Sequence, residues 1–400
     1  QPSPADTPPL DTAAAVEDPS GDEDSQRGHD RGFAWALQVV DDFEVEAQQQ
    51  GCPRSDLLRV WLRAREPSFD NLVPKGAEHS VLSAWGDILM MMNQAIEAKD
   101  ERRQLAAAVA QSVFLQVIFR RENVMRSKAL PTLIMRRCAR WNQGEWKEMF
   151  EEVQEVQELR ANQPDRGLHA PQVAADNQDG PEPALRETES HRTWECNVKA
   201  ATRDLRKGCI AKATEKLLNK ARQPITEARK EKARAMHPPS STNGDIDQDI
   251  LDFQVEEQYD FSDEDGSSIL LKALRGLKNG KSPGGSGLRY EYLKVWLADD
   301  LARDNILRPF LTAICNGAVS EEVAAIMGDS DLVLLDKDEE GGIRPVALLE
   351  AIRTLAGRMV LAKEIGNLRK ALLPFQLAVG IKGGIEVCVH AVRGILEKLP

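Results

Sequence analysis

The chain has 400 residues, of which 42% are hydrophobic and only 5% aromatic, so it can form sizeable cores that should be mainly aliphatic. Its net charge of −12, averaged over the whole chain, argues against a nucleic-acid partner. The charge is segregated, however: residues 199–234 carry twelve Lys and Arg against four acidic residues, whereas residues 240–268 carry ten acidic residues and no Lys or Arg. Such blocks are typical of solvated tails and interaction surfaces.

Cysteine usage and hydropathy indicate an intracellular chain. The six cysteines are scattered, without a Cys-x-x-Cys pair or a His at metal-binding spacing, which argues against a zinc site or a disulfide framework. No apolar run approaches the roughly 18 residues that a membrane span needs, and the acidic N-terminus is unlike a signal peptide. We therefore expect an intracellular protein without a membrane partner. Because the chain starts with Gln and stops just after an apparent helix, we interpret it as a piece of a longer protein.

The N-terminal part is predicted to be helical after an acidic, disordered tail at residues 1–32. Apolar residues recur at helical spacing through residues 33–160, and this periodicity predicts a helical region with a long helical stretch from about 81 to 127. Residues 161–192 are rich in Pro, Gln, Asn and Asp and are predicted to form a linker.

A basic helical segment is predicted at residues 193–238, and an acidic linker follows it at 239–267. The cations of the basic segment form either a solvated helix face or one wall of a groove for a phosphate backbone, and the pattern leaves both interpretations open. By charge alone, the acidic linker could fold over the basic segment when nucleic acid is absent.

Three short motifs imitate known sites. Residues 276–282 resemble a phosphate-binding P-loop, but only three residues separate the two glycines, no strand precedes them, and Pro283 follows. Asp252 and the pair Asp299-Asp300 resemble pieces of polymerase metal boxes, but neither lies among residues of strong strand propensity. We interpret Asp299-Asp300 as the cap of a helix.

A β-hairpin is predicted over residues 332–347, with a helix behind it. An apolar run ends at Lys337, a glycine-rich polar turn follows, and Arg344 lies at the start of the return strand. Pairing of the strands would bring both cations to one tip, where Arg supplies a fork of donors and Lys a point charge for a triphosphate. A surface hairpin with solvated charges explains the same pattern, and the residues alone leave the two interpretations equal.

Four motifs follow one another in a suggestive order: the glycine loop at 280–284, the strand at 332–337, the Arg-Pro-Val return strand at 344–346, and a Gln ahead of a Gly-x-x-Gly-Gly turn at 376–384. In this order and spacing they resemble the N-terminal fingers part of a reverse transcriptase of the non-LTR retrotransposon class. The resemblance covers residues 268–400, about a third of the chain.

The resemblance implies an α+β, predominantly α-helical chain, in which the helical region and the linkers precede the fingers and the start of the palm of a right-hand polymerase. The implied partners are an RNA template, a DNA primer and deoxynucleoside triphosphates. The full-length enzyme would use Mg²⁺ held by palm aspartates, but no candidate for these aspartates follows Arg393. We therefore expect this chain to bind no metal and to bind its ligands without polymerising. The alternative is an inactive, retroelement-derived nucleic-acid-binding or scaffold protein.

The resemblance also assigns ligand contacts to individual residues. Lys337 and Arg344 match the fingertip cations that hold the phosphates of the incoming nucleotide. Six further residues match positions along the template or the template–primer duplex: Lys281, Ser282, Gly284, Gln376, Gly380 and Lys382. Two positions depart from the family, since Ser286 stands where an Asp is usual and Val379 where an aromatic residue is usual.

Overall fold

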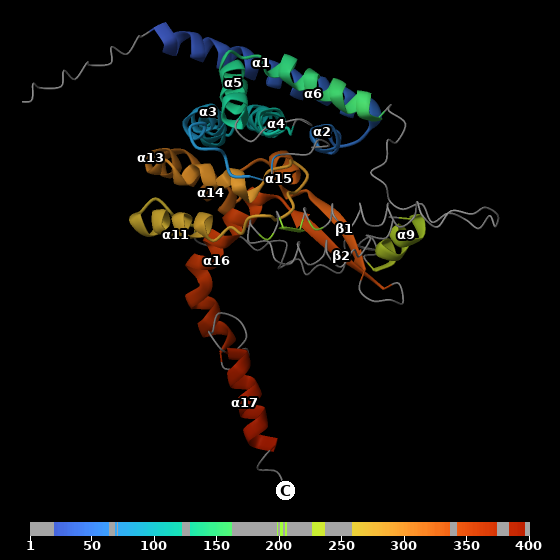
Figure 1. Ribbon diagram of the computed structural model, residues 1–400, viewed down its shortest axis with the longest axis vertical. Helices are drawn as coiled ribbons and strands as arrows, with labels where there is room; N and C mark the ends of the chain where they lie inside the picture. The colour runs from blue at the N-terminus through green and yellow to red at the C-terminus, as the bar shows by residue number, and fades with distance from the viewer. Residues whose placement is uncertain are drawn as a thin grey trace, which may run out of the picture.

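The computed structural model describes residues 20–63, 69, 71–121, 129–161, 198, 201–202, 205, 226–236, 258–336, 342–373 and 384–396. Within these residues the chain is predominantly helical and holds a single two-stranded antiparallel sheet (Figure 1). The expectation of a helix-dominated α+β chain is therefore confirmed, whereas the polymerase fold that the resemblance implies stays a prediction.

Six helices form the N-terminal layers: α1 (Ser20–Gln50), α2 (Arg54–Leu62), α3 (Glu78–Glu97), α4 (Glu101–Ile118), α5 (Leu130–Asn142) and α6 (Trp146–Ala161). Helix α4 lies at the centre, where α1, α3, α5 and α6 contact it. Every residue of α4 from Gln104 to Ile118 is buried. Four of these residues are alanines, whose small side chains allow the surrounding helices to approach closely.

The long helical stretch predicted from about 81 to 127 consists, in its described part, of two helices, α3 and α4. They are separated at Lys99, which has a left-handed backbone with φ of 53°. The side chain of Asp100 then accepts a hydrogen bond of 3.0 Å from the backbone N–H of Arg103. Asp is a favoured N-cap residue, so this local signal starts α4 although the apolar periodicity continues across the break.

Helix α1 begins at Ser20, inside the stretch that composition predicted as a disordered tail. Two glycines bring this end of the helix against the turn between α5 and α6. A Cβ atom on Gly28 would overlap the carbonyl oxygen of Asn142, and one on Gly32 would overlap the indole ring of Trp146. The acidic composition concealed this contact, and Gly by itself disfavours a helix.

The remaining elements are α9 (Glu227–Met236), α11 (Glu264–Arg275), α12 (Tyr290–Leu293), the 3₁₀-helix η2 (Lys294–Leu297), α13 (Asp300–Ala302), the π-helix η3 (Arg303–Leu307), α14 (Arg308–Cys315), α15 (Glu321–Gly328), β1 (Ser330–Asp336), β2 (Ile343–Leu349), α16 (Ala351–Leu372) and α17 (Gly384–Leu396). Helix α11 starts within the predicted acidic linker, because the Asp263 carboxylate accepts a hydrogen bond of 2.7 Å from the N–H of Gly266. The C-terminal end of α16 and the whole of α17 project from the body of the molecule (Figure 1).

The N-terminal helices and the elements from α11 to α16 share one hydrophobic core. Trp85 of α3 meets Trp296 edge to face with ring centroids 5.7 Å apart. Phe119, just after α4, stacks on Tyr292 at 3.9 Å, and the Tyr292 hydroxyl donates to the carbonyl oxygen of Phe69. These aromatic contacts join the predicted helical region to the block that carries the reverse-transcriptase resemblance.

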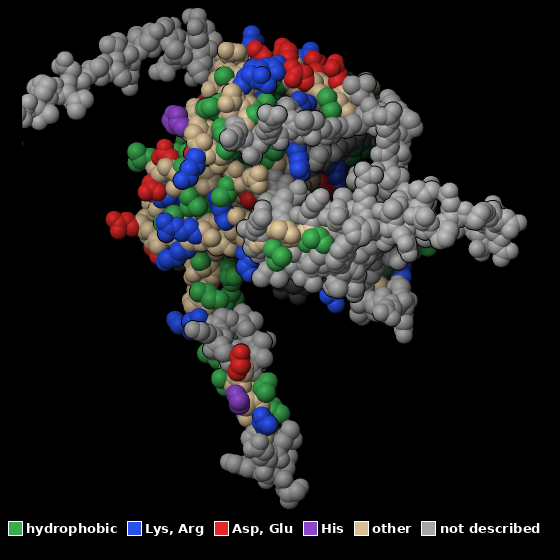
Figure 2. All heavy atoms as spheres, in the orientation of Figure 1, with side chains coloured by type: hydrophobic (Ala, Val, Ile, Leu, Met, Phe, Trp, Pro, Cys, Tyr) green, Lys and Arg blue, Asp and Glu red, His purple; other side chains and the backbone are tan. Residues whose placement is uncertain are grey.

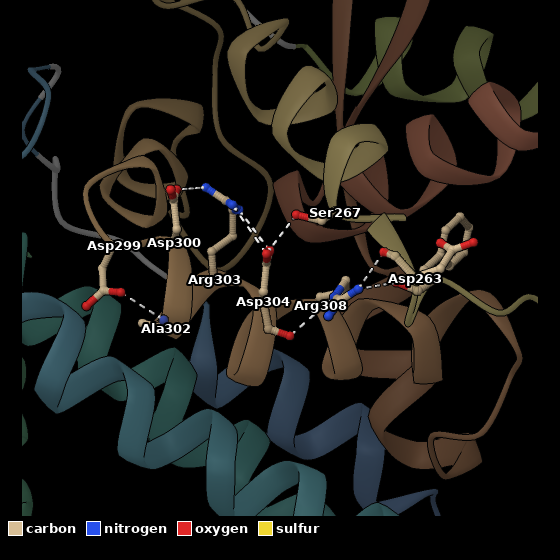
Figure 3. Close-up of polar contacts among 9 residues, drawn as sticks. Asp263, Ser267, Asp299, Asp300, Ala302, Arg303, Asp304 and Arg308 are labelled. Carbon is tan, nitrogen blue, oxygen red and sulfur yellow. Dashed lines mark hydrogen bonds and ion pairs between the residues drawn. The ribbon is translucent and has the colours of Figure 1, made fainter. Parts of the chain in front are cut away.

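Asp299 and Asp300 belong to a structural polar network, as the sequence predicted (Figure 3). Asp299 accepts a hydrogen bond of 2.9 Å from the N–H of Ala302 and so caps α13. Asp300 pairs with Arg303, whose side chain is only 4% exposed. Asp304 accepts from Arg303 and also binds the Ser267 hydroxyl at 2.7 Å, which ties the π-helix to α11.

Candidate nucleotide and template site

The antiparallel strands β1 and β2, here called the ribbon, carry the candidate nucleotide-binding cation Arg344. Leu335 pairs with Arg344 and Asp336 with Ile343, so the predicted hairpin is confirmed and Arg344 lies near the tip. The Arg344 side chain is exposed, and within the described residues no hydrogen bond or ion pair engages its guanidinium. Lys337, its predicted companion, lies outside the described residues, so their pairing stays a prediction.

The other end of the ribbon is fixed to the body. Ser330 pairs with Leu349 at this end, and the neighbouring residue of β1, Asp331, forms an ion pair with Arg63 at the end of α2. Glu350 follows β2 directly and is only 5% exposed. The base of the ribbon is therefore anchored, while the strands extend from it toward the tip that bears Arg344.

The glycine loop, residues 280–287, lies against the base of the ribbon. Ser286 donates two hydrogen bonds to the Glu350 carboxylate, one from its backbone N–H at 2.7 Å and one from its hydroxyl at 2.6 Å. A Cβ atom on Gly284 would come within 2.7 Å of the same carboxylate and 3.0 Å of the Glu350 nitrogen. Glycine is thus required at 284 because the loop packs directly on the start of α16.

The first end of the glycine loop is fixed by a second buried carboxylate. Gly280 has a φ of 79°, and its N–H donates to Glu291, which is 1% exposed, at 2.6 Å. The next residues, Lys281 and Ser282, are exposed between the two anchored ends of the loop. The Gly280 amide, which would bind phosphate in a P-loop, donates to the Glu291 carboxylate instead. This agrees with the interpretation that residues 276–282 are not a P-loop.

Burial raises the pKa of the Glu350 carboxyl, because water is excluded from its charged form. The two hydrogen bonds from Ser286 oppose this shift, and the nearby Asp329 and Asp331 add to it. An acidic side chain at position 286 would place one more carboxylate against Glu350. Serine supplies a donor instead, so Ser286 and the buried Glu350 form one local arrangement.

Sequence reasoning did not single out either carboxylate anchor. Glu350 stands at the junction of an apolar strand and a helix, where an acidic residue is commonly a solvated helix start. Glu291 lies in a short helix beside aromatic residues, and its burial follows from packing between distant elements.

A small cavity lies behind the glycine loop, lined in part by Gln111, Ser112, Ser286 and Glu350. Its volume of about 30 Å³ has room for about two water molecules and excludes a nucleotide. Lys281 and Ser282 of the loop and Arg344 of the ribbon are exposed and lie outside this cavity.

The basic helix α9 lies beside β2 (Figure 1). Its Ala233 is 6% exposed, whereas Lys230, Lys232 and Arg234 are exposed on the helix surface. The described part of the predicted basic segment is therefore placed next to the strand that carries Arg344. Gln376, Gly380 and Lys382, the other candidate template residues, lie outside the described residues.

Among the described residues, no group of three or more His, Cys, Asp and Glu side chains could hold a metal ion. The Mg²⁺ that the resemblance implies for a full-length enzyme therefore finds no fitting ligand set among these residues. The same part of the chain contains no helix that is both long enough and apolar enough to span a membrane.

The described residues thus define a helix-rich α+β protein in which a glycine loop packs on the base of a two-stranded ribbon that exposes Arg344. No known protein family, curated protein or solved structure matches the chain.

Proposed function

We propose that the chain is the fingers part of an RNA-directed DNA polymerase of the non-LTR retrotransposon type. It contributes contacts to the template and the incoming nucleotide, and it lacks the metal-binding aspartates of the palm. The observation that carries the proposal is the exposed Arg344 guanidinium on the ribbon, which has no hydrogen-bond or ion-pair partner among the described residues. An unpaired guanidinium offers its planar donors to phosphate oxygens at no cost in broken protein contacts.

The two anchored ends of the glycine loop also support this proposal. Its two ends are held by Glu291 and Glu350, so the exposed Lys281 and Ser282 between them are presented on a fixed backbone. Because Glu350 is also the first residue after β2, the loop and the ribbon are joined through one side chain. Such preorganisation lowers the entropy lost when a flexible phosphate chain is bound.

Substitution of Arg344 by Ala tests the proposal. Charge-assisted hydrogen bonds are worth about 1.5–3 kcal/mol, so we expect the variant to bind a deoxynucleoside triphosphate about 10- to 100-fold more weakly. Isothermal titration with dTTP measures the affinity, and Arg344→Lys should recover part of it through its point charge. The matched control is Arg136→Ala, which removes an exposed arginine of α5. Equal affinities of Arg344→Ala and Arg136→Ala would contradict the proposal.

The second candidate function is sequence-independent nucleic-acid binding by an inactive, retroelement-derived protein, and the position of α9 beside β2 favours it. Nucleic-acid binding through α9 requires only contacts to phosphates, and it does not require a nucleotide bound at the tip of the ribbon. Replacement of Lys230 and Arg234 by Gln distinguishes the two candidate functions. A loss of RNA affinity in this variant, together with undetectable dTTP binding by the unmodified chain, would favour the binding protein.

A further inference from the structure

A second basic surface lies away from the ribbon, in a groove between α11 and α16. The groove has a volume of about 420 Å³. Its apolar floor includes Ile269, Ala273 and Ala362, and its cations are Lys272 of α11 and Arg358 and Lys363 of α16. In Figure 1, α11 and the ribbon lie on different sides of α16, so this groove is separate from the candidate nucleotide site. Lys and Arg side chains are visible over α11 in Figure 2.

Among the described residues, the charges in the groove are only partly balanced by protein partners. Asp265, the one acidic side chain among the described lining residues, is 66% exposed and approaches Lys363 only to 3.9 Å, a geometry that contributes little. Lys363 also lies 6.0 Å from the centre of the Phe261 ring. After the hydrogen bonds from Ser262, it contributes to the lowered pKa of the Asp260 carboxyl, so the least engaged cations are Lys272 and Arg358. Arg358 is half-buried, and within the described residues its guanidinium makes no hydrogen bond or ion pair. The absence of a side chain at Gly276 makes room for this guanidinium, since a Cβ atom there would stand 3.1 Å from it.

A purely structural role accounts for only part of this arrangement. Lys272 and Arg275 lie in the last turn of α11, where cations offset the negative end of the helix dipole by about 0.3–1 kcal/mol each. Arg358 and Lys363 come from another helix, and in the described part of the chain Arg358 remains without an acceptor after the dipole has been offset. The groove therefore keeps donors available for an anion.

The lining indicates which anion the groove accepts. Its polar groups are cations and one carboxylate, without the amide, hydroxyl or accessible aromatic side chains that read or stack on bases. We infer that the groove between α11 and α16 binds the sugar–phosphate backbone of a nucleic-acid strand, without regard to base sequence. The inference extends the proposed function to a second contact, and it rests on that function only for the choice of nucleic acid as the partner.

The test measures how salt affects RNA binding by the 400-residue chain. The groove variant carries Lys272→Gln, Arg358→Gln and Lys363→Gln. The control variant carries Lys75→Gln, Arg136→Gln and Lys147→Gln, three exposed positions in the N-terminal layers with the same total charge change. Affinity for a fluorescently labelled 30-nucleotide poly(U) RNA is measured by anisotropy at several salt concentrations, and thermal unfolding checks that each variant is folded.

Each phosphate contact to a single strand contributes about 0.7 to the slope of log affinity against log salt concentration. We expect the groove variant to lose about 2 from this slope and to bind at least about 10-fold more weakly at low salt. The control should retain the slope of the unmodified chain. If Arg358→Gln impairs folding, the double variant Lys272→Gln/Lys363→Gln, with both side chains exposed, should still lose about 1.4 from the slope.

A groove variant with the slope of the control would overturn the inference. So would a groove variant that loses affinity for a polyglutamate peptide but not for the RNA, because the groove would then recognise an acidic peptide. Titration of Arg344→Ala with dTTP keeps the two proposals apart. If the groove variant loses its salt slope while Arg344→Ala binds dTTP as tightly as the unmodified chain does, the groove is supported and the nucleotide site is contradicted. If the groove variant keeps its salt slope while Arg344→Ala binds dTTP more weakly, only the groove is contradicted.

Discussion

Arg54 and Arg140 of the N-terminal layers are used differently from Arg344 and Arg358 of the block from α11 to α16. In the N-terminal layers, Arg54 of α2 pairs with Glu322 and Glu44, and Arg140 of α5 pairs with Glu145 and Glu152. In the other block, Arg344 and Arg358 lack partners among the described residues. The first group stabilises the packing of helices, and the second leaves charged donors available to a ligand.

Gly28 and Gly366 repeat this contrast. In the N-terminal layers, Gly28 is pressed against the backbone at Asn142, whereas a Cβ atom on Gly366 of α16 would meet nothing within 4 Å. The backbone at Gly28 is closely packed, and the C-terminal part of α16 has open space around Gly366. If this comparison is right, substitutions in the N-terminal layers should affect stability, and substitutions on the ribbon and in the groove should affect binding.

The largest expected effect is that of Gly28→Ala. The added methyl group overlaps backbone atoms, which cannot move aside as a flexible side chain can, so we expect a loss of about 3 kcal/mol in the free energy of unfolding. Gly366→Ala is the matched control and should stabilise the exposed helix by up to about 1 kcal/mol. Urea unfolding followed by circular dichroism measures both. Equal effects of the two substitutions would mean that α1 does not pack on the turn as described.

The next effect concerns the join between the glycine loop and the ribbon. Ser286→Asp replaces a donor with a second carboxylate beside Glu350, and we expect a loss of about 2 kcal/mol at neutral pH. The destabilisation should diminish as the pH falls, because protonation of either carboxyl removes the repulsion. Ser286→Ala loses one hydrogen bond without adding charge, so its effect should depend less on pH. If Ser286→Asp lowered the free energy of unfolding equally at pH 5 and pH 8, the result would argue against two carboxylates that face each other at positions 286 and 350.

The direction of the Glu350 pKa fixes the sign of this pH dependence. Its carboxyl has a pKa above the ordinary 4.5 in the folded chain, so the folded state binds the proton more tightly than the unfolded state does. The contribution of Glu350 to stability is therefore most favourable below pH 4.5 and decreases as the pH rises through the raised pKa. Glu350→Gln, which cannot ionise, should remove this decrease.

The sequence predicted the ribbon, the helix behind it and the capping role of Asp299, because each depends on a local pattern. It missed Glu350 and Glu291, because their burial results from contacts with residues distant in the chain. The early start of α1 was missed for the same reason. The break at Lys99 is different, since Asp100 was a local signal that the continuing apolar periodicity outweighed in the prediction.

The smallest expected effect sharpens the contrast between paired and unpaired arginines. Arg54→Ala removes the ion-pair partner of the partly exposed Glu44 and Glu322, so we expect a loss of about 1–2 kcal/mol in the free energy of unfolding. Arg344→Ala removes an exposed side chain without a partner, and its free energy of unfolding should stay within about 0.5 kcal/mol of the unmodified chain.

Urea unfolding of the two variants, measured beside dTTP binding, gives the decisive pair of readouts. If Arg344→Ala lost stability as Arg54→Ala does, the Arg344 guanidinium would be engaged within the fold. Its effect on nucleotide binding would then be indirect. Unchanged stability together with weakened binding has a direct cause, because a side chain that holds no part of the protein in place can alter affinity only through the ligand it contacts.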